Sequence, residues 1–182
     1  MRIETRILAG TTILAALVVV FDYSMKFSGL KMPFPWLPTL KFDFTGIPIA
    51  LAYFLFGFVP GVFTSVIAFV AILARSGDVV ASSMKALAEL STVVGMALAF
   101  RLVPRFSRVS SFLLGVLARC SVMFFANLVV LPSFYHMPFA VAVSVSPLIV
   151  AFNVLQGSLG ILGGYFLHEA LRRRVPSLVK RS

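Results

Sequence analysis

Residues 7–21 read Ile-Leu-Ala-Gly-Thr-Thr-Ile-Leu-Ala-Ala-Leu-Val-Val-Val-Phe, an apolar run without a charged side chain. With its flanks, Thr5–Ser24, the run has about the 20 residues that a helix needs to cross the hydrocarbon core of a bilayer. Arg2 and Arg6 precede it, as in a signal peptide, but no small-x-small cleavage site follows. We therefore expect a retained first transmembrane helix.

The whole chain shares this apolar character. Of its 182 residues, 60% are hydrophobic and 12% are charged, and the mean hydropathy is +1.03. An average soluble domain is about 45–50% apolar and about 25% charged, so this chain cannot cover itself with polar surface. We expect a single all-α integral membrane domain over residues 1–182, without room for a second soluble domain.

Five further apolar segments follow, separated by polar residues, glycine or proline, so we predict six transmembrane helices. Pro104 and Pro132 are expected to end the fourth and fifth of them. The segment at about 25–42 is rich in proline and aromatic residues, and we expect it to be a long extracellular loop. The predicted spans after the first are about Phe44–Phe56, Val62–Ala74, Val79–Leu102, Val109–Leu131 and Ala142–Leu171.

The basic residues are unevenly distributed over the predicted loops. Six spans place both termini on one side, which then holds ten of the sixteen lysines and arginines, against four on the other side. Because cytoplasmic loops retain positive charge, we expect cytoplasmic termini in the plasma membrane, and the net charge of +10 needs no nucleic-acid partner. The ten are Arg2, Arg6, Arg101, Arg105, Arg108, Arg172, Arg173, Arg174, Lys180 and Arg181; the four are Lys26, Lys31, Lys41 and Arg75.

Three ionisable residues, Lys85, Glu89 and Arg119, lie well away from the ends of predicted spans, where a charge is costly and often functional. Glu89 and Arg119 lie at nearly equal depth when a rise of about 1.5 Å per residue is applied. We predict an interhelical ion pair between them, serving either helix packing or ligand binding. Lys85, one turn before Glu89 on the same face, competes for that carboxylate.

Three amides, Asn127, Asn153 and Gln156, lie in the outer halves of the fifth and sixth predicted spans. Amides donate and accept hydrogen bonds without charge. Together they would suit a neutral, polar, heterocyclic ligand reached from outside. The alternative is that they join helices by hydrogen bonds.

Several function classes find no support in the sequence. A Walker A motif is absent, so the chain does not hydrolyse nucleotide by itself. Ser158 and His168 are ten residues apart on one helix, about 15 Å, too far for a nucleophile and its base. We expect neither an enzyme nor a metal site. Cys120 is the single cysteine, which excludes an internal disulfide.

Four short stretches, in order along the chain, resemble those of riboflavin-type S components of energy-coupling factor (ECF) transporters. The resemblance implies a six-helix membrane subunit that captures a vitamin from outside. It also implies a membrane coupling subunit and two ATP-binding-cassette ATPases as partners. The stretches are Pro38-Thr-Leu-Lys-Phe-Asp-Phe-Thr-Gly-Ile-Pro48; Phe56-Gly57 with Pro60-Gly61; Arg119-Cys-Ser-Val-Met123 with Asn127, Leu131-Pro132 and Tyr135; and Phe152-Asn153-Val-Leu-Gln156-Gly157.

A substrate site follows from the resemblance and the polar residues together. The loop at 25–42 would cover it, with Phe34 and Trp36 either stacking on the ligand or anchoring the loop at the membrane interface. The transported ligand would be riboflavin, and no further cofactor is expected. The candidate substrate-binding residues are Phe34, Trp36, Leu40, Lys41, Asp43, Lys85, Glu89, Arg119, Asn127, Asn153 and Gln156.

The chain departs from the family pattern at two places. Riboflavin members usually carry lysine where this chain has Gln156, so a related vitamin is an alternative ligand. The family's Ala-x-x-x-Ala docking pattern on the first helix is represented only by Thr11/Ala15 and Thr12/Ala16. Two other functions stay open: a structural or assembly subunit that binds no ligand, and a stand-alone secondary transporter.

Overall fold

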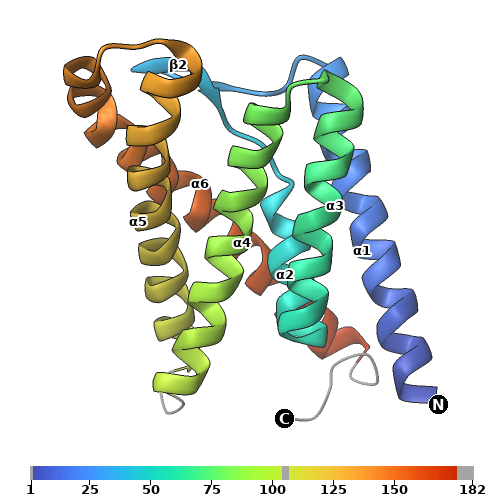
Figure 1. Ribbon diagram of the computed structural model, residues 1–182. Helices are drawn as coiled ribbons and strands as arrows, with labels where there is room; N and C mark the ends of the chain where they lie inside the picture. The colour runs from blue at the N-terminus through green and yellow to red at the C-terminus, as the bar shows by residue number, and fades with distance from the viewer. Residues whose placement is uncertain (1, 104–106, 176–182) are drawn as a thin grey trace.

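Six helices form the body of the protein in the computed structural model, which describes residues 2–103 and 107–175. Five of them, all but α2, are long and apolar enough to cross a membrane. The predicted all-helical membrane fold is therefore found in the described part of the chain (Figure 1). The helices are α1 (Arg2–Phe27), α2 (Gly46–Phe56), α3 (Phe58–Ser76), α4 (Val79–Leu102), α5 (Ser107–Tyr135) and α6 (Phe139–Arg174).

Helix α2 is short, and other helices surround it. It has 11 residues, about 16 Å of helix, and it packs against α1, α3, α4 and α6. A helix that is apolar on all sides belongs in the interior, and Ile49, Ala50 and Ala52 are almost completely buried. The preceding loop therefore enters the bundle before the helix begins.

Glycines allow two close helix contacts. At Gly164 on α6, a Cβ would lie 2.7 Å from Ala50 Cβ on α2; at Gly95 on α4, it would lie 2.3 Å from the Leu114 carbonyl on α5. The helix faces that carry Gly95 on α4 and Gly164 on α6 thus pack inside the fold. Gly57 alone links α2 to α3, and its φ of 98° explains why glycine is used there.

Most of the helices are a few residues longer than predicted, and the largest differences are near prolines. Pro132 does not end α5, which continues to Tyr135, and α6 begins at Phe139 and includes Pro147. Proline inside a transmembrane helix is tolerated because neighbouring groups satisfy the freed carbonyl. Helix α4 ends at Leu102 as expected, while Pro104 lies outside the described residues.

The long loop contains a short β-ribbon, which the expectation of an all-α chain omitted. Strand β1 (Pro33–Phe34) pairs antiparallel with β2 (Leu37–Lys41). The segment before it is held by Asp22, which is fully buried at the end of α1. Asp22 accepts from Lys31 Nζ at 2.6 Å and from Arg75 Nε on α3 at 2.6 Å. The ribbon is therefore anchored to the bundle at its base.

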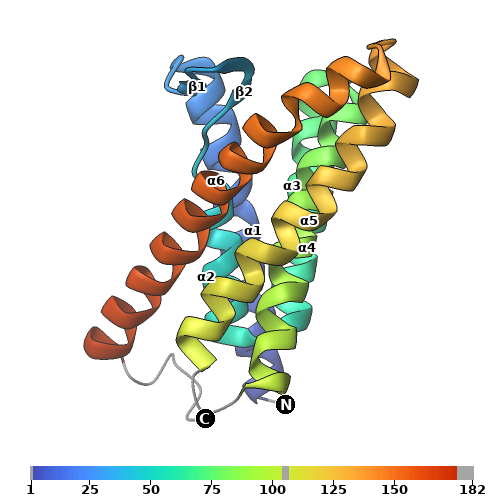
Figure 2. The ribbon, with the colours of Figure 1, turned by 90° about the vertical axis from the view of Figure 1, so that its left-hand side faces the viewer.

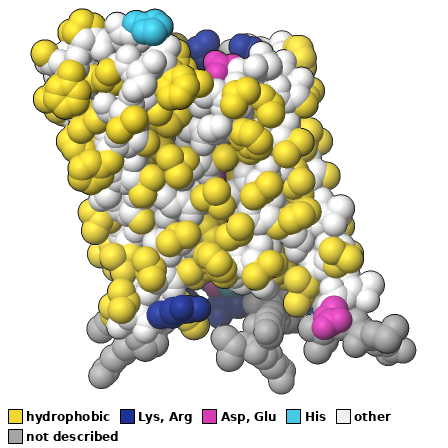
Figure 3. All heavy atoms as spheres, viewed as in Figure 1, with side chains coloured by type: hydrophobic (Ala, Val, Ile, Leu, Met, Phe, Trp, Pro, Cys, Tyr) yellow, Lys and Arg dark blue, Asp and Glu magenta, His cyan; other side chains and the backbone are white. Residues whose placement is uncertain are grey.

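The β-ribbon and the first turn of α1 lie at opposite ends of the bundle (Figures 1 and 2). In both figures the last turn of α6 lies at the same end as the first turn of α1. Hydrophobic side chains cover the middle of the face in Figure 3, with Lys and Arg at both rims. Of the ten basic residues assigned to the terminal end, Arg105, Lys180 and Arg181 lie outside the described residues.

Candidate ligand-binding site

Four ionisable side chains form one buried network where the loop after the ribbon meets α4 and α5. Lys85 Nζ lies 2.9 Å from Asp43 Oδ1 and 2.9 Å from Glu89 Oε1. Arg119 Nη1 lies 3.1 Å from the same Glu89 oxygen. The predicted Glu89–Arg119 pair is therefore present, and Lys85 shares its acceptor. Two acids and two bases leave no net charge, which avoids the large penalty of an uncompensated buried charge.

Two amides of α6 join this network. Gln156 Nε2 donates to the Asp43 carbonyl at 2.8 Å, and the Asp43 N–H donates back to Gln156 Oε1 at 3.4 Å. Asn153 Oδ1 accepts from Arg119 Nε at 3.0 Å, while its Nδ2 donates to the Ile149 carbonyl at 2.9 Å. The network thus connects the loop with α4, α5 and α6.

Asn127 stands apart from the other two amides. Its Nδ2 donates to the Met123 carbonyl, one turn earlier on α5, at 2.7 Å. Within the described ranges, no hydrogen bond joins it to another helix. The structure therefore brings Asn153 and Gln156 into one cluster with Arg119 and leaves Asn127 outside it.

Aromatic rings close the space above the network. Phe34 on β1 is 1% exposed, and its ring centroid lies 5.7 Å from that of Phe152 on α6 and 6.0 Å from that of Phe42. Trp36, at the turn of the ribbon, contacts Phe34 edge-on at 5.2 Å and remains 68% exposed. Phe34 thus fills the position beneath the ribbon, whereas Trp36 lies at its outer surface.

The remaining loop candidates have different environments. Leu40 is half-buried and Lys41 is exposed, both on β2. Asp43 is buried, and burial alone would raise its pKa. The Lys85 ammonium and the Thr45 hydroxyl, which donates to Asp43 Oδ1 at 2.6 Å, outweigh that effect and lower the pKa from 3.8 to about 2. Asp43 is therefore an anion at neutral pH.

The network leaves little free space. The crevice beside it, lined by Gly46, Glu89, Arg119, Gln156 and other residues, has no room for even a water molecule. Pockets for small molecules usually measure roughly 300–1,000 Å³. A molecule the size of a vitamin therefore does not fit beside the network in this structure.

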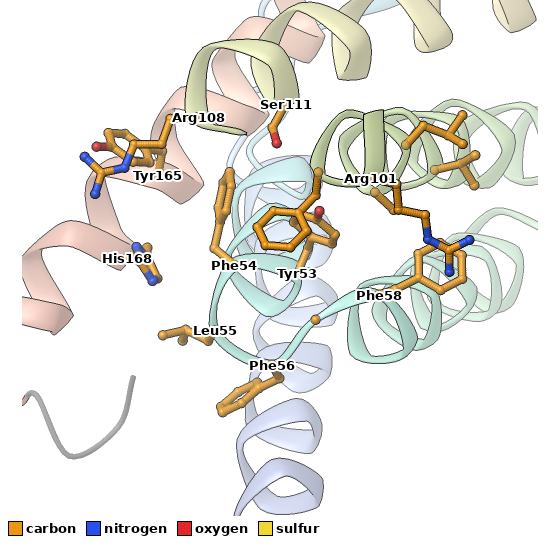
Figure 4. Close-up of a pocket in the computed structure, with 15 residues that line it drawn as sticks. Tyr53, Phe54, Leu55, Phe56, Phe58, Arg101, Arg108, Ser111, Tyr165 and His168 are labelled. Carbon is orange, nitrogen blue, oxygen red and sulfur yellow. The ribbon is translucent and has the colours of Figure 1, made fainter. Parts of the chain in front are cut away.

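A larger cavity, which the sequence did not suggest, lies at the opposite end of the bundle. It measures about 640 Å³ and is bordered by the α2–α3 link, α4, α5 and α6. Aromatic side chains and two arginines surround it (Figure 4). In the sequence, Arg101 and Arg108 contributed only to the charge bias of the loops, and no pattern indicated that they line one cavity.

The candidate docking residues on α1 lie on two different faces. Thr11 and Ala15 are each 6% exposed and pack inside the fold. Thr12 and Ala16 are exposed on the outer side of the helix. Only the Thr12/Ala16 pair therefore remains available to a partner.

Comparison with known proteins identifies the fold. No family model and no curated protein matches the chain. A solved structure described as the S component of a bacterial ECF transporter matches 98% of this chain and 99% of its own. The TM-score is 0.76 and the sequence identity 24%. The chain therefore has the fold of that S component over its whole length.

Proposed function

We propose that the chain is the substrate-binding S component of an ECF-type transporter, which captures riboflavin or a related flavin from outside for ATP-driven uptake. The main support is a buried cluster that contains Arg119, Asn153 and Gln156. These residues belong to two of the stretches that resemble riboflavin-type members. The full-length similarity in fold supports the same proposal.

In this proposal the ribbon is a lid over the ligand. Opening would move Phe34 away from Phe152 and expose the donors and acceptors of Gln156, Asn153 and Arg119. These groups match a heterocycle with carbonyl acceptors and N–H donors. Phe34 or Trp36 would then stack on the rings of the ligand, and Asn127 would reach it from α5.

Partners and orientation follow from the same proposal. A membrane coupling subunit would dock on the exposed Thr12/Ala16 face of α1 and link the chain to two ATP-binding-cassette ATPases. The terminal end of the bundle would face the cytoplasm, since most of the basic residues flank it. The ribbon would then face the outside of the cell.

One observation favours a second function, that of a structural subunit without a ligand. Within the described part of the chain, the ionisable and amide groups of the network all have protein partners, so the fold is complete without a ligand. A vitamin other than a flavin is a further alternative, because Gln156 replaces the usual lysine. A stand-alone secondary transporter would use the same cluster without ATPases.

The test is to purify the chain from cells grown with riboflavin and to record its absorbance spectrum. Mass spectrometry of the material released on denaturation identifies the ligand. We expect flavin absorbance and a stoichiometric flavin. A colourless protein that releases another vitamin would contradict the proposal that the ligand is a flavin. A protein that releases nothing and does not bind riboflavin would favour the structural subunit. Uptake by vesicles that contain the chain alone would indicate the secondary transporter.

A further inference from the structure

We propose that the cavity at the terminal end of the bundle binds an anionic phospholipid, with an acyl chain in the aromatic interior and the negatively charged headgroup attracted by Arg101 and Arg108, which border the cavity on different sides (Figure 4). This inference does not depend on flavin binding, because the cavity and the buried network are separate in the structure.

The shape of the cavity suits an acyl chain that enters from the side. Towards this end α6 diverges from α5 (Figure 2). The cavity is lined there by residues of α2, α4, α5 and α6 and of the α2–α3 link. Phe58, Leu98 and Phe100 line it, and each is also between 46% and 56% exposed. The wall of the cavity therefore continues into the surface that faces lipid.

The polar part of the lining is positive. Arg101 and Arg108 border the cavity, and none of the residues that line it is acidic. Neither arginine forms an ion pair with a described residue; Arg108 lies over the Tyr165 ring at 6.0 Å. Arginine offers several N–H donors in a fixed geometry that matches phosphate. Figure 4 shows Arg108 beside Tyr165 and Arg101 beside Phe58, on different sides of the cavity, so one arginine would hold the phosphate while the other adds positive charge at the same end.

His168 supplies an independent observation. It lines the cavity from α6, and its Nδ1 atom is buried without a hydrogen-bond partner in the described part of the chain. Buried polar atoms in proteins nearly always have a partner. Figure 4 shows its ring between α6 and the side chains of Phe54 and Leu55. A phosphate or glycerol hydroxyl in the cavity could satisfy this atom.

The location fits the chemistry. The cavity lies at the end of the bundle where α6 carries Arg172, Arg173 and Arg174 in its last turn. Basic pockets between helices on the cytoplasmic side of a membrane bind anionic headgroups, and each Lys or Arg near the surface contributes about fivefold in affinity. Arg101 and Arg108 together should therefore favour an anionic over a zwitterionic lipid by roughly 30-fold.

The test uses the full chain in a neutral detergent, titrated with dioleoylphosphatidylglycerol, with dioleoylphosphatidylcholine or with inorganic phosphate. Native mass spectrometry measures bound lipid, and thermal unfolding reports stabilisation. We expect the anionic lipid to bind roughly 30-fold more tightly than the zwitterionic one. Arg101→Gln with Arg108→Gln should abolish the preference. Arg6→Gln with Arg174→Gln changes the charge at the same end equally, outside the cavity, and should keep it.

A second variant tests the acyl-chain part. Ala97→Phe, on α4, fills the cavity from the side and should remove binding of both lipids without changing the arginines. It also carries the test if the double arginine variant does not fold. Equal affinity for the two lipids overturns the proposal. So does equal loss in the control variant, retained binding in Ala97→Phe, or stabilisation by inorganic phosphate alone, which would indicate a simple anion site.

Discussion

The side-chain amide of Gln156 pairs with the peptide group of Asp43 in both directions, donating at 2.8 Å and accepting at 3.4 Å. In this way a residue in the middle of α6 imitates the edge of a strand and holds the end of the β-ribbon against the helix. The pairing needs a donor and an acceptor at the end of one side chain. An amide provides both, whereas a lysine provides only donors.

Gln156→Lys introduces the residue usual in riboflavin members. This variant distinguishes a role of residue 156 in ligand binding from its pairing with the Asp43 peptide group. The lysine loses the bond to the Asp43 N–H but can donate charge-assisted bonds, about twice as strong as neutral ones, to a flavin carbonyl. We expect riboflavin affinity to hold or rise in calorimetric titration of the detergent-solubilised protein.

The control for this variant is Gln156→Met, which keeps the length but removes all hydrogen bonds. It should lose affinity by roughly tenfold to a hundredfold, since an unsatisfied buried group costs about 1–3 kcal/mol. If a folded Gln156→Lys protein no longer binds flavin, residue 156 does not contact the ligand as it would in a riboflavin-type member.

Glu89 should matter more for stability than Arg119, because its oxygen serves two cations. Glu89→Gln leaves Arg119 buried without an acidic partner, which costs about 3–5 kcal/mol. Arg119→Gln leaves Glu89 paired with Lys85, so its cost should be smaller. Thermal unfolding in detergent measures both. Equal losses would mean that the shared oxygen does not control the network.

The sequence predicted this ion pair and the depth of the amides because helical rise converts residue number into height. It did not reveal which way each side chain faces around its helix. Asn127 therefore seemed equivalent to Asn153, although among the described residues its amide bonds only within α5. Thr11 and Thr12 looked interchangeable for the same reason, yet one is buried and the other exposed.

Loop and helix-end details were also beyond the sequence. Proline usually ends helices in water, but in α5 and α6 the chain continues through Pro132 and Pro147. The anchor formed by Asp22, Lys31 and Arg75 joins three segments far apart in the chain. Such contacts depend on the packing of α1 against α3, which composition and periodicity do not specify.

Asn153→Ala and Asn127→Ala test the amides as ligand contacts. Asn153→Ala removes the acceptor of the Arg119 Nε–H group and should weaken riboflavin affinity roughly tenfold to a hundredfold. Asn127 holds no other helix, so Asn127→Ala should change the unfolding temperature little. A loss of riboflavin affinity in that variant would then report a direct contact. Unchanged affinity in a folded Asn153→Ala protein would move the site elsewhere.

The α1 surface can be tested by adding bulk where partners would approach. Ala16→Leu enlarges an exposed position next to Thr12 and should weaken co-purification with the coupling subunit without affecting the fold. Ala81→Leu makes the same change at an exposed position on α4 and serves as the control. If Ala16→Leu assembles normally, the docking surface is not on this face of α1.

Trp36 is the only tryptophan in the chain, and it lies at the turn of the ribbon, 68% exposed and in edge contact with Phe34. Its fluorescence therefore reports the ribbon alone. If the ribbon must lift to admit a ligand, riboflavin should change the Trp36 emission with a rate that levels off at high ligand concentration, because opening limits entry. Stopped-flow fluorescence measures this rate, and free tryptophan at the same riboflavin concentrations corrects for absorption by the flavin. Trp36→Phe should lose the signal while calorimetry still detects binding. An unchanged emission at saturating riboflavin, with binding seen by calorimetry, would show that the ribbon does not cover the ligand.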